Sequence, residues 1–271
     1  MYRVGLAIVL AFLPGFATAE PEAAPRRVLT IDEQAEWSGV GRLNHSRGGF
    51  CSGALIGPDK VLTAAHCVTD EATNSPVPPL DLRFVAGLRT GVYTAHRRAV
   101  RADTHPDWSG YLKQGGVIVA GDMALVRLET PISDSEARVF RPGPAPEEGD
   151  EVTLVSYGRG REGALSIQEP CHVLKRWRNS VELNCDSVNG TSGSPVFRNG
   201  EVVAVISASD KGPREDGGQR RSYAVLVEGS LEALTATEPV AAAPAGRAKT
   251  LFRKAPSGGS RLPGGSRPPS Q

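Results

Sequence analysis

The stretch FCSGALIGPDKVLTAAHC occupies residues 50–67 of the chain. Its two apolar runs, CSGALI and KVLTAA, flank a Gly-Pro-Asp turn signal at positions 57–59. Short apolar runs that are separated by turn residues are typical of antiparallel strands. The stretch therefore predicts a β-hairpin that leads to a histidine, His66, beside Cys67.

Strand-like runs of the same kind recur between Trp37 and Val227, where helical periodicity is scarce. They are VGRL, LRFVAGL, RRAVRA, MALVRL, EVTLVSY, VELN, SPVF, EVVAVIS and SYAVLV. This pattern favours an all-β fold of antiparallel barrels or a sandwich over an α/β fold. A break over residues 131–150 divides the runs into two halves. The sequence SLEAL, from Ser230, predicts a short closing helix with Ser230 as its N-cap.

The two ends of the chain differ from its middle in composition. Residues 1–19, MYRVGLAIVLAFLPGFATA, combine a basic start, a short apolar run and a small-residue cleavage pattern, which predicts a signal peptide cut before Glu20. An uncleaved anchor is the alternative. We interpret residues 20–34 as an N-terminal segment, 35–236 as the folded domain and 237–271 as a disordered tail rich in Pro, Gly and Ser. No later stretch is long and apolar enough for a transmembrane helix, so we expect a secreted or periplasmic protein.

The formal net charge of +1 is unevenly distributed. Beyond Glu238 the chain has no acidic residue and six basic ones: Arg247, Lys249, Arg253, Lys254, Arg261 and Arg267. This basic tail is interpreted either as a solvated appendage or as a tether to anionic surfaces such as envelope polymers. Nucleic-acid binding is not expected, because Phe252 is the only aromatic residue of the tail and base stacking needs several.

Four cysteines in an exported chain predict two disulfides. Three pairings are possible, and local pairing of Cys51 with Cys67 and of Cys171 with Cys185 is the most economical. Zinc binding is the competing interpretation, but no CxxC occurs and the histidines are not at ligand spacing. We therefore expect neither a metal nor a cofactor.

The stretch NGTSGSPVF, at residues 189–197, places Ser192 in a turn with glycines at 190 and 193. Such a serine is either part of an ordinary surface turn or a presented nucleophile, which would need a base and an orienting acid. His66 is the candidate base because it follows an apolar run, whereas His45, His96, His105 and His172 lie among polar or turn residues. Asp122, just before MALVRL, is the candidate acid, although an aspartate at such a position is usually a turn residue.

LTAAHC, DMALVRL and GTSGSPVF together resemble the three active-site motifs of the chymotrypsin-like and trypsin-like serine peptidases, in that family's His, Asp, Ser order. THPDW and SYGRGREG are also similar, so the resemblance covers about residues 35–235. It implies two packed antiparallel β-barrels and protein or peptide substrates. It also implies a catalytic triad of His66, Asp122 and Ser192, with an oxyanion hole formed by the backbone N–H groups of Gly190 and Ser192.

At two positions the sequence differs from the residues that the family has there. Thr191 stands where the family's mammalian digestive members have the aspartate that receives a new amino terminus, so activation by cleavage is not expected. SGSP resembles the bacterial, secreted glutamyl-endopeptidase-like branch, yet Ile206 stands where that branch has a pocket histidine, so a preference for glutamate is not expected.

The resemblance also implies a set of substrate-binding residues. Asp186, six residues before Ser192, matches the acid at the base of the specificity pocket in trypsin-like members, which predicts cleavage after Arg or Lys. The alternative is an acid that only caps a turn after Cys185. The resemblance further implies that Ser207, Ala208 and Ser209 pair with the substrate backbone, and that the Ser209 side chain narrows the pocket mouth.

The sequence thus predicts an exported serine endopeptidase. One alternative is a catalytically silent binding protein of the cell envelope on the same fold. Another is an α/β-hydrolase esterase, which needs G-x-S-x-G followed by an acid and a histidine. Ser194 replaces the last glycine of that motif, and no histidine follows Ser192.

Overall fold

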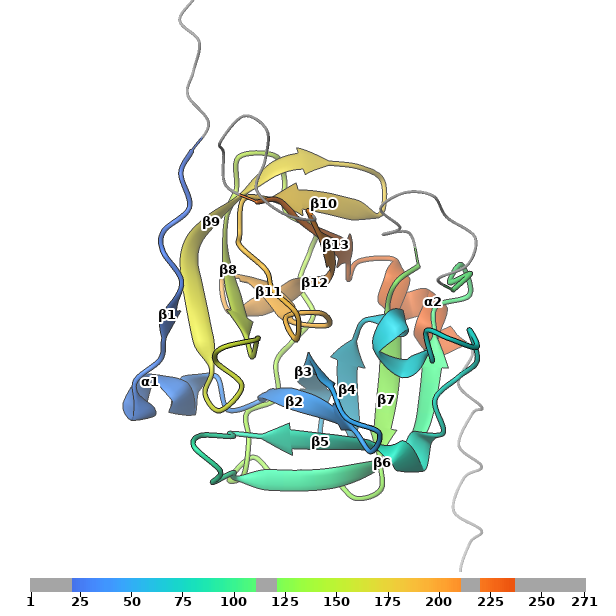
Figure 1. Cartoon of the computed structure of the whole chain (residues 1–271). Coiled ribbons are helices and arrows are strands. Elements are labelled where there is room, and N and C mark those ends of the chain that lie inside the picture. Colours follow the sequence, from blue (N-terminus) through green and yellow to red (C-terminus); the bar gives the residue numbers. More distant parts are fainter. Residues whose placement is uncertain (1–20, 111–120, 211–219, 237–271) are drawn as a thin grey trace, which may run out of the picture. The chain divides into compact units, whose positions relative to one another are not determined.

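The computed structural model describes residues 21–110, 121–210 and 220–236, and they fold into two antiparallel β-barrels (Figure 1). The predicted signal peptide at 1–19 and the basic tail at 237–271 lie outside the described residues. Among the described residues, no helix is both long and apolar enough to cross a membrane.

The first barrel closes in the order β2-β3-β4-β7-β6-β5. Its strands are β2 (Val40–His45), β3 (Phe50–Gly57), β4 (Lys60–Thr63), β5 (Leu82–Ala86), β6 (Ala95–Thr104) and β7 (Ala124–Leu128). β3 and β4 form the hairpin predicted from residues 50–67, and the 3-10 helix η1 (Ala65–Val68) follows it directly. A second 3-10 helix, η2 (Pro79–Asp81), precedes β5.

The second barrel is made of β8 to β13. Its strands are β8 (Glu151–Ser156), β9 (Ser166–Arg176), β10 (Ser180–Leu183), β11 (Pro195–Arg198), β12 (Glu201–Ser209) and β13 (Ser222–Leu226). The strands run in the order β9-β10-β13-β12-β11-β8, and pairing of β8 with β9 closes the ring. The short strand β1 (Arg27–Val28) adds to the outside of β9.

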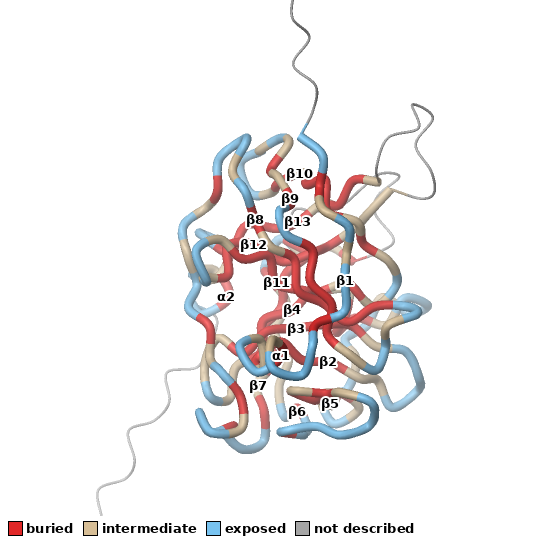
Figure 2. The backbone as a smooth tube through the Cα atoms, turned by 90° about the vertical axis from the view of Figure 1, so that its left-hand side faces the viewer, coloured by how far each residue is buried: buried red, intermediate tan, exposed pale blue. Residues whose placement is uncertain are grey.

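The buried apolar residues form two clusters, one that fills the first barrel and extends to where the barrels meet, and one within the second barrel. Figure 2 shows the buried parts of the backbone in red. Trp37 and Phe140 both pack on Phe197, with ring centroids 4.8 Å away in each case. Tyr157 is fully buried, and its hydroxyl donates to the Leu88 carbonyl at 2.9 Å, which joins the end of β8 to the loop after β5. Burial of these large side chains is the main favourable term for the fold.

The all-β prediction with two barrels is confirmed, and so is the short C-terminal helix, α2 (Ser230–Ala236). This helix starts at Ser230 itself, whereas the sequence predicted Ser230 as the N-cap. The helix α1 (Ile31–Glu36) was not predicted, although Thr30 and Glu33 form a capping box that begins it. Strand β9 was not predicted either, because Glu169 and Pro170 interrupt its apolar pattern.

Candidate active site

His66 lies in η1, immediately after β4. A disulfide between Cys51 on β3 and Cys67 holds η1 against the hairpin. The second predicted pairing, Cys171 with Cys185, is also present, so both disulfide predictions are confirmed. The sulfur atoms of Cys51 and Cys67 lie near the His66 ring, but they are bonded to each other and therefore offer no thiolate to a metal.

Asp122 lies just before β7 and is almost completely buried. One of its oxygens, Oδ2, is 2.7 Å from His66 Nδ1, and the other, Oδ1, accepts from the His66 backbone N–H at 2.8 Å. The Ser207 hydroxyl, from β12, also donates to Oδ2 at 2.5 Å. The carboxylate thus fixes both the ring and the main chain of His66, and a residue of the second barrel holds the carboxylate in place.

Opposing effects act on the pKa of His66. Burial alone would lower it, but the negative charge of Asp122, the hydrogen bond to that carboxylate and the charge of Glu71 together raise it above the ordinary histidine value. A carboxylate at Nδ1 also selects the tautomer that leaves Nε2 as an acceptor. The imidazole is therefore oriented as a general base requires.

The turn that carries Ser192 packs against the first barrel. Gly190 and Gly193 have φ values of +91° and +76°. A Cβ on Gly193 would lie 2.2 Å from Thr63 Oγ1, at the end of β4. A Cβ on Gly190 would lie 2.4 Å from the Phe50 ring. Both glycines are therefore needed for their conformation and for close approach to the first barrel.

Ser52, fully buried on β3, holds this turn from the other barrel. Its backbone N–H donates to the Ser192 carbonyl at 2.8 Å, and its hydroxyl donates to the Gly190 carbonyl at 3.0 Å. The Tyr157 N–H donates to the same hydroxyl at 3.1 Å. Ser52 was not predicted as a site residue, because its partners lie more than a hundred residues away in the chain and no local pattern marks them.

The backbone amides of the turn fall into two groups. Thr191, Gly193 and Ser194 each donate to a backbone carbonyl of the fold. For the N–H groups of Gly190 and Ser192, no acceptor is found in the described part of the chain. These are the two donors that the sequence predicted for an oxyanion hole. Within the same described residues, no hydrogen bond joins the Ser192 hydroxyl to His66, a contact that often tightens only when substrate is bound.

The other predicted site residues lie in the second barrel, next to this turn. Asp186 follows Cys185 and has a side chain that is 40% exposed, with Arg220 Nε 3.5 Å from its Oδ1. Ala208 and Ser209 pair with Tyr223 and Ser222 of β13, whereas the pairing of β12 with β11 ends at Val205.

Two further positions from the family comparison are buried. Ile206 accepts from the Gly193 N–H at 2.8 Å and therefore supports the turn. The Thr191 side chain caps the turn by accepting from the Val188 N–H at 3.2 Å. Neither side chain is presented to solvent.

A cavity of about 600 Å³ opens beside His66 on the side of the first barrel. Residues of the β2–β3 turn and of the loop after η1 line it, among them His45, Phe50, Thr69, Asp70 and Pro76. Burial lowers the pKa of His45, which favours its neutral form on this wall.

Comparison with known proteins agrees with this geometry. Residues 51–205 match the trypsin-like peptidase domain family. Brachyurin from Leptuca pugilator is 26% identical over 189 residues, which cover 58% of this chain and 75% of that protein. A trypsin from Saccharopolyspora erythraea is 23% identical over 184 residues, which cover 58% of this chain and 74% of that protein.

The fold is also that of a solved glutamyl endopeptidase in complex with MPD. That structure superposes with a TM-score of 0.62 at 19% identity and covers 80% of this chain and 97% of its own. Two closed barrels of this kind define the chymotrypsin-like class. This chain belongs to the trypsin-like peptidase domain family and is a serine endopeptidase.

Proposed function

We propose that this protein hydrolyses peptide bonds through an acyl-enzyme formed on Ser192, with His66 as base and acid and Asp122 as the group that orients His66. The observation that carries the proposal is the carboxylate of Asp122, which is shared between His66 and Ser207. A buried carboxylate in this position stabilises the imidazolium that forms when the serine proton is transferred.

The reaction then follows from the residues in place. The Ser192 hydroxyl attacks the scissile carbonyl while His66 takes its proton. The N–H groups of Gly190 and Ser192 form the proposed oxyanion hole and donate to the developing oxyanion. Their lack of an acceptor among the described residues supports this role. His66 returns the proton to the leaving amine, and the acyl-enzyme is hydrolysed by a water molecule that His66 deprotonates in turn.

A fluorophosphonate probe tests this proposal on the purified protein. We expect wild type to be labelled and Ser192→Ala to remain folded, unlabelled and inactive, because triad deletions cost on the order of a million-fold in turnover. A matched control is Ser194→Ala, which removes a neighbouring hydroxyl that is buried and has no hydrogen-bond partner among the described residues. Folded wild type that is not labelled would favour the catalytically silent binding protein instead.

We further propose a modest preference for Arg or Lys before the scissile bond, with Asp186 at the base of the pocket and Ser207, Ala208 and Ser209 along the substrate backbone. The partly exposed carboxylate of Asp186 supports this, since a charge-assisted contact is stronger than a neutral one. The neighbouring Arg220 competes for the same charge. For that reason we expect a modest rather than an absolute preference.

Matched peptides with Arg, Glu, Phe or Ala before the scissile bond measure this preference. We expect Arg to give the highest kcat/KM in wild type and to lose that advantage in Asp186→Ser. Arg220→Ala should strengthen the preference, because it removes the competing cation. An Arg preference that is unchanged in Asp186→Ser would show that another residue determines specificity.

Three further proposals concern the branch of the family and the place where the protein acts. Export through the segment 1–19 is supported by the two disulfides, which form in oxidising compartments. A place in the bacterial, secreted branch rests on SGSP in the turn, and contact of the basic tail with anionic surfaces rests on charge alone. Mass spectrometry of the secreted protein tests the first proposal by locating the mature amino terminus at Glu20.

A further inference from the structure

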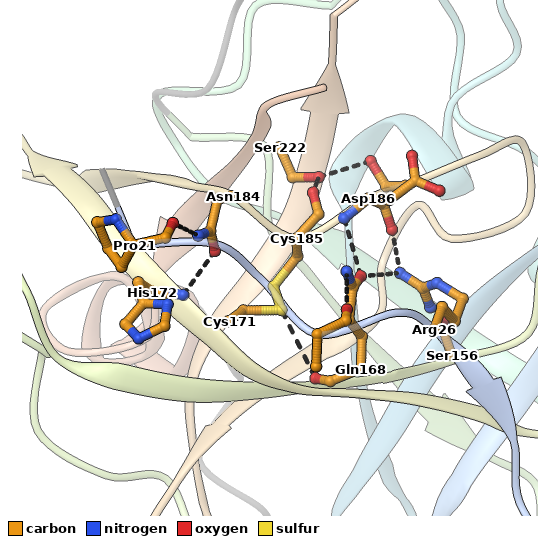
Figure 3. The surroundings of a disulfide bond; sticks show 12 residues. Pro21, Arg26, Ser156, Gln168, Cys171, His172, Asn184, Cys185, Asp186 and Ser222 are labelled. Carbon is orange, nitrogen blue, oxygen red and sulfur yellow. Dashed lines mark hydrogen bonds between the residues drawn. A yellow bond between two sulfur atoms is a disulfide. The ribbon is translucent and has the colours of Figure 1, made fainter. Parts of the chain in front are cut away.

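Arg26, in the segment that precedes the first barrel, extends its side chain into the second barrel (Figure 3). Its Nη1 donates to the buried Ser156 hydroxyl, at the end of β8, at 2.6 Å. Its Nη2 donates to Gln168 Oε1, on β9, at 3.3 Å and also to the main-chain carbonyl of Asp186. One guanidinium therefore joins the N-terminal segment to two strands and to the segment that precedes Ser192.

Gln168 connects the same groups a second time. Its buried Oε1 accepts from the Asp186 N–H at 2.9 Å as well as from Arg26. Its Nε2 donates to the Ala24 carbonyl at 2.8 Å. Both main-chain polar groups of Asp186 are thus bound by a network in which Arg26 contributes a cation.

This guanidinium is held without a carboxylate hydrogen bond among the described residues. Burial and the nearby positive charge of Arg161 lower the pKa of Arg26 to about 10, with the charge of Asp186 acting in the opposite direction. The side chain therefore remains charged at neutral pH. Removing it would leave the Asp186 carbonyl without its donor and Gln168 Oε1 with one donor instead of two, and loss of a donor is costly for polar groups in a buried place.

The hydrogen bonds of Arg26 and Gln168 hold Asp186, in the segment Cys185–Ser187. The same segment is also bound by Ser222, whose hydroxyl donates to the Cys185 carbonyl at 2.6 Å and contacts the Ser187 hydroxyl at 2.8 Å. The turn that follows, from Gly190 to Gly193, is held by Ser52 of the first barrel. Arg26 and Ser222 thus bind the segment Cys185–Ser187 through hydrogen bonds that are separate from those between Ser52 and the turn Gly190–Gly193.

We propose that Arg26 is a positioning residue that holds the segment Cys185–Ser187, and with it Asp186, in the shape that binds substrate. This inference rests on the proposed function, in which Asp186 lies at the base of the primary specificity pocket. The N-terminal segment is accordingly a part of the binding site, and its loss removes a donor from the pocket wall.

The variant Arg26→Met keeps most of the apolar stem and removes the donors. We expect it to raise KM for a peptide with Arg before the scissile bond about tenfold, while the rate of fluorophosphonate labelling stays within about twofold of wild type. Arg26→Lys should recover part of the loss, because it restores a cationic donor. Hydrogen exchange at the amides of 185–188 should become faster in Arg26→Met.

Arg27→Met is the matched control. Arg27 is half exposed and pairs with Glu33 at 2.8 Å and Glu169 at 3.6 Å, outside the network of Arg26. We expect this variant to keep the wild-type KM and the wild-type exchange at 185–188, because exposed ion pairs contribute little.

Three results would overturn the inference: equal KM values for Arg26→Met and Arg27→Met, unchanged hydrogen exchange at 185–188, or a parallel fall in labelling and in peptide binding. The last result would indicate a general defect in folding. Failure of the proposed function is a separate outcome, because wild type would then not be labelled. In that case hydrogen exchange still decides whether Arg26 holds the segment. If Arg26→Met does not fold, Arg26→Lys is compared with Arg27→Lys by the same measurements.

Discussion

At Asp122 a single carboxylate accepts three hydrogen bonds, two from His66 and one from Ser207. Such a group keeps its orientation without rearrangement of the protein, which is the condition for electrostatic stabilisation of a developing charge. Ser207 was predicted as a substrate-binding residue, and its side chain turns instead to this carboxylate. The same residue therefore belongs to both the proposed substrate-binding strand and the support of the proposed triad.

The raised pKa of His66 has a consequence for the pH dependence of activity. A base must be neutral to accept a proton, so kcat/KM should fall as pH drops through this raised pKa. Glu71→Gln removes one of the charges that raise the pKa of His66, so the acid limb of the pH profile should move to lower pH. The profile of kcat/KM against pH measures this shift, and high salt should reduce the difference between the variant and wild type.

Glu232→Gln provides the control for this prediction, because this exposed glutamate on α2 is not among the charges that act on His66. Its acid limb should coincide with that of wild type. An acid limb that is unchanged in Glu71→Gln would mean that the exposed carboxylate is fully screened by solvent.

At the scale of elements, the β3–β4 hairpin contributes to both halves of the site. Ser52 on β3 binds the turn of Ser192, and η1 at the other end of the hairpin carries His66. The disulfide of Cys51 and Cys67 joins these two parts of the hairpin. The hairpin is therefore the element that positions the proposed base, His66, relative to the proposed nucleophile, Ser192.

Replacing Cys51 and Cys67 with serine should consequently reduce both stability and activity. Loss of a native disulfide typically costs about 2–5 kcal/mol in unfolding free energy. Thermal unfolding and the rate of fluorophosphonate labelling measure the two effects. The same double substitution at Cys171 and Cys185 should lower stability with a smaller effect on labelling, because that bridge lies wholly in the second barrel. Equal labelling rates for the two double variants would contradict this role of the hairpin.

At the scale of the whole molecule, the segment that precedes the first barrel is packed on the second one. Ala23 and Leu29 are buried, and Asn184 Nδ2 donates to the Pro21 carbonyl at 2.7 Å. β1 then pairs with β9, on the left of Figure 1. The amino-terminal segment thus already has defined contacts with the second barrel in a chain that has not been cleaved after Arg27.

A chain that begins at Glu20 should therefore already be active. Thr191 has no carboxylate to receive a new amino terminus, and its hydroxyl is used within the turn. Fluorophosphonate labelling and peptide cleavage by chains that begin at Glu20 or at Val28 compare the two forms. We expect the chain from Glu20 to bind substrate better, because it retains Arg26. Activity of the shorter chain alone would indicate activation by cleavage after Arg27.

Much of the site could be predicted because the relevant signals are local. Each strand of the hairpin is a short apolar run, and His66, Asp122 and Ser192 lie in motifs of six to eight residues. Local patterns failed where tertiary contacts decide the structure. β9 contains Glu169 and Pro170 and is stabilised by pairing with three other strands.

By itself, the sequence determined the all-β class, the two local disulfides and the order of the residues in the proposed triad. The strands and the three motifs depend on side-chain patterns within a few residues, and each disulfide joins cysteines that are only 16 or 14 positions apart. Tertiary structure alone decided that Ser52 holds the turn of Ser192 and that Arg26 and Gln168 hold Asp186. Their partners are remote in the chain, and polar groups become paired in this way only when folding removes them from water and brings them into contact.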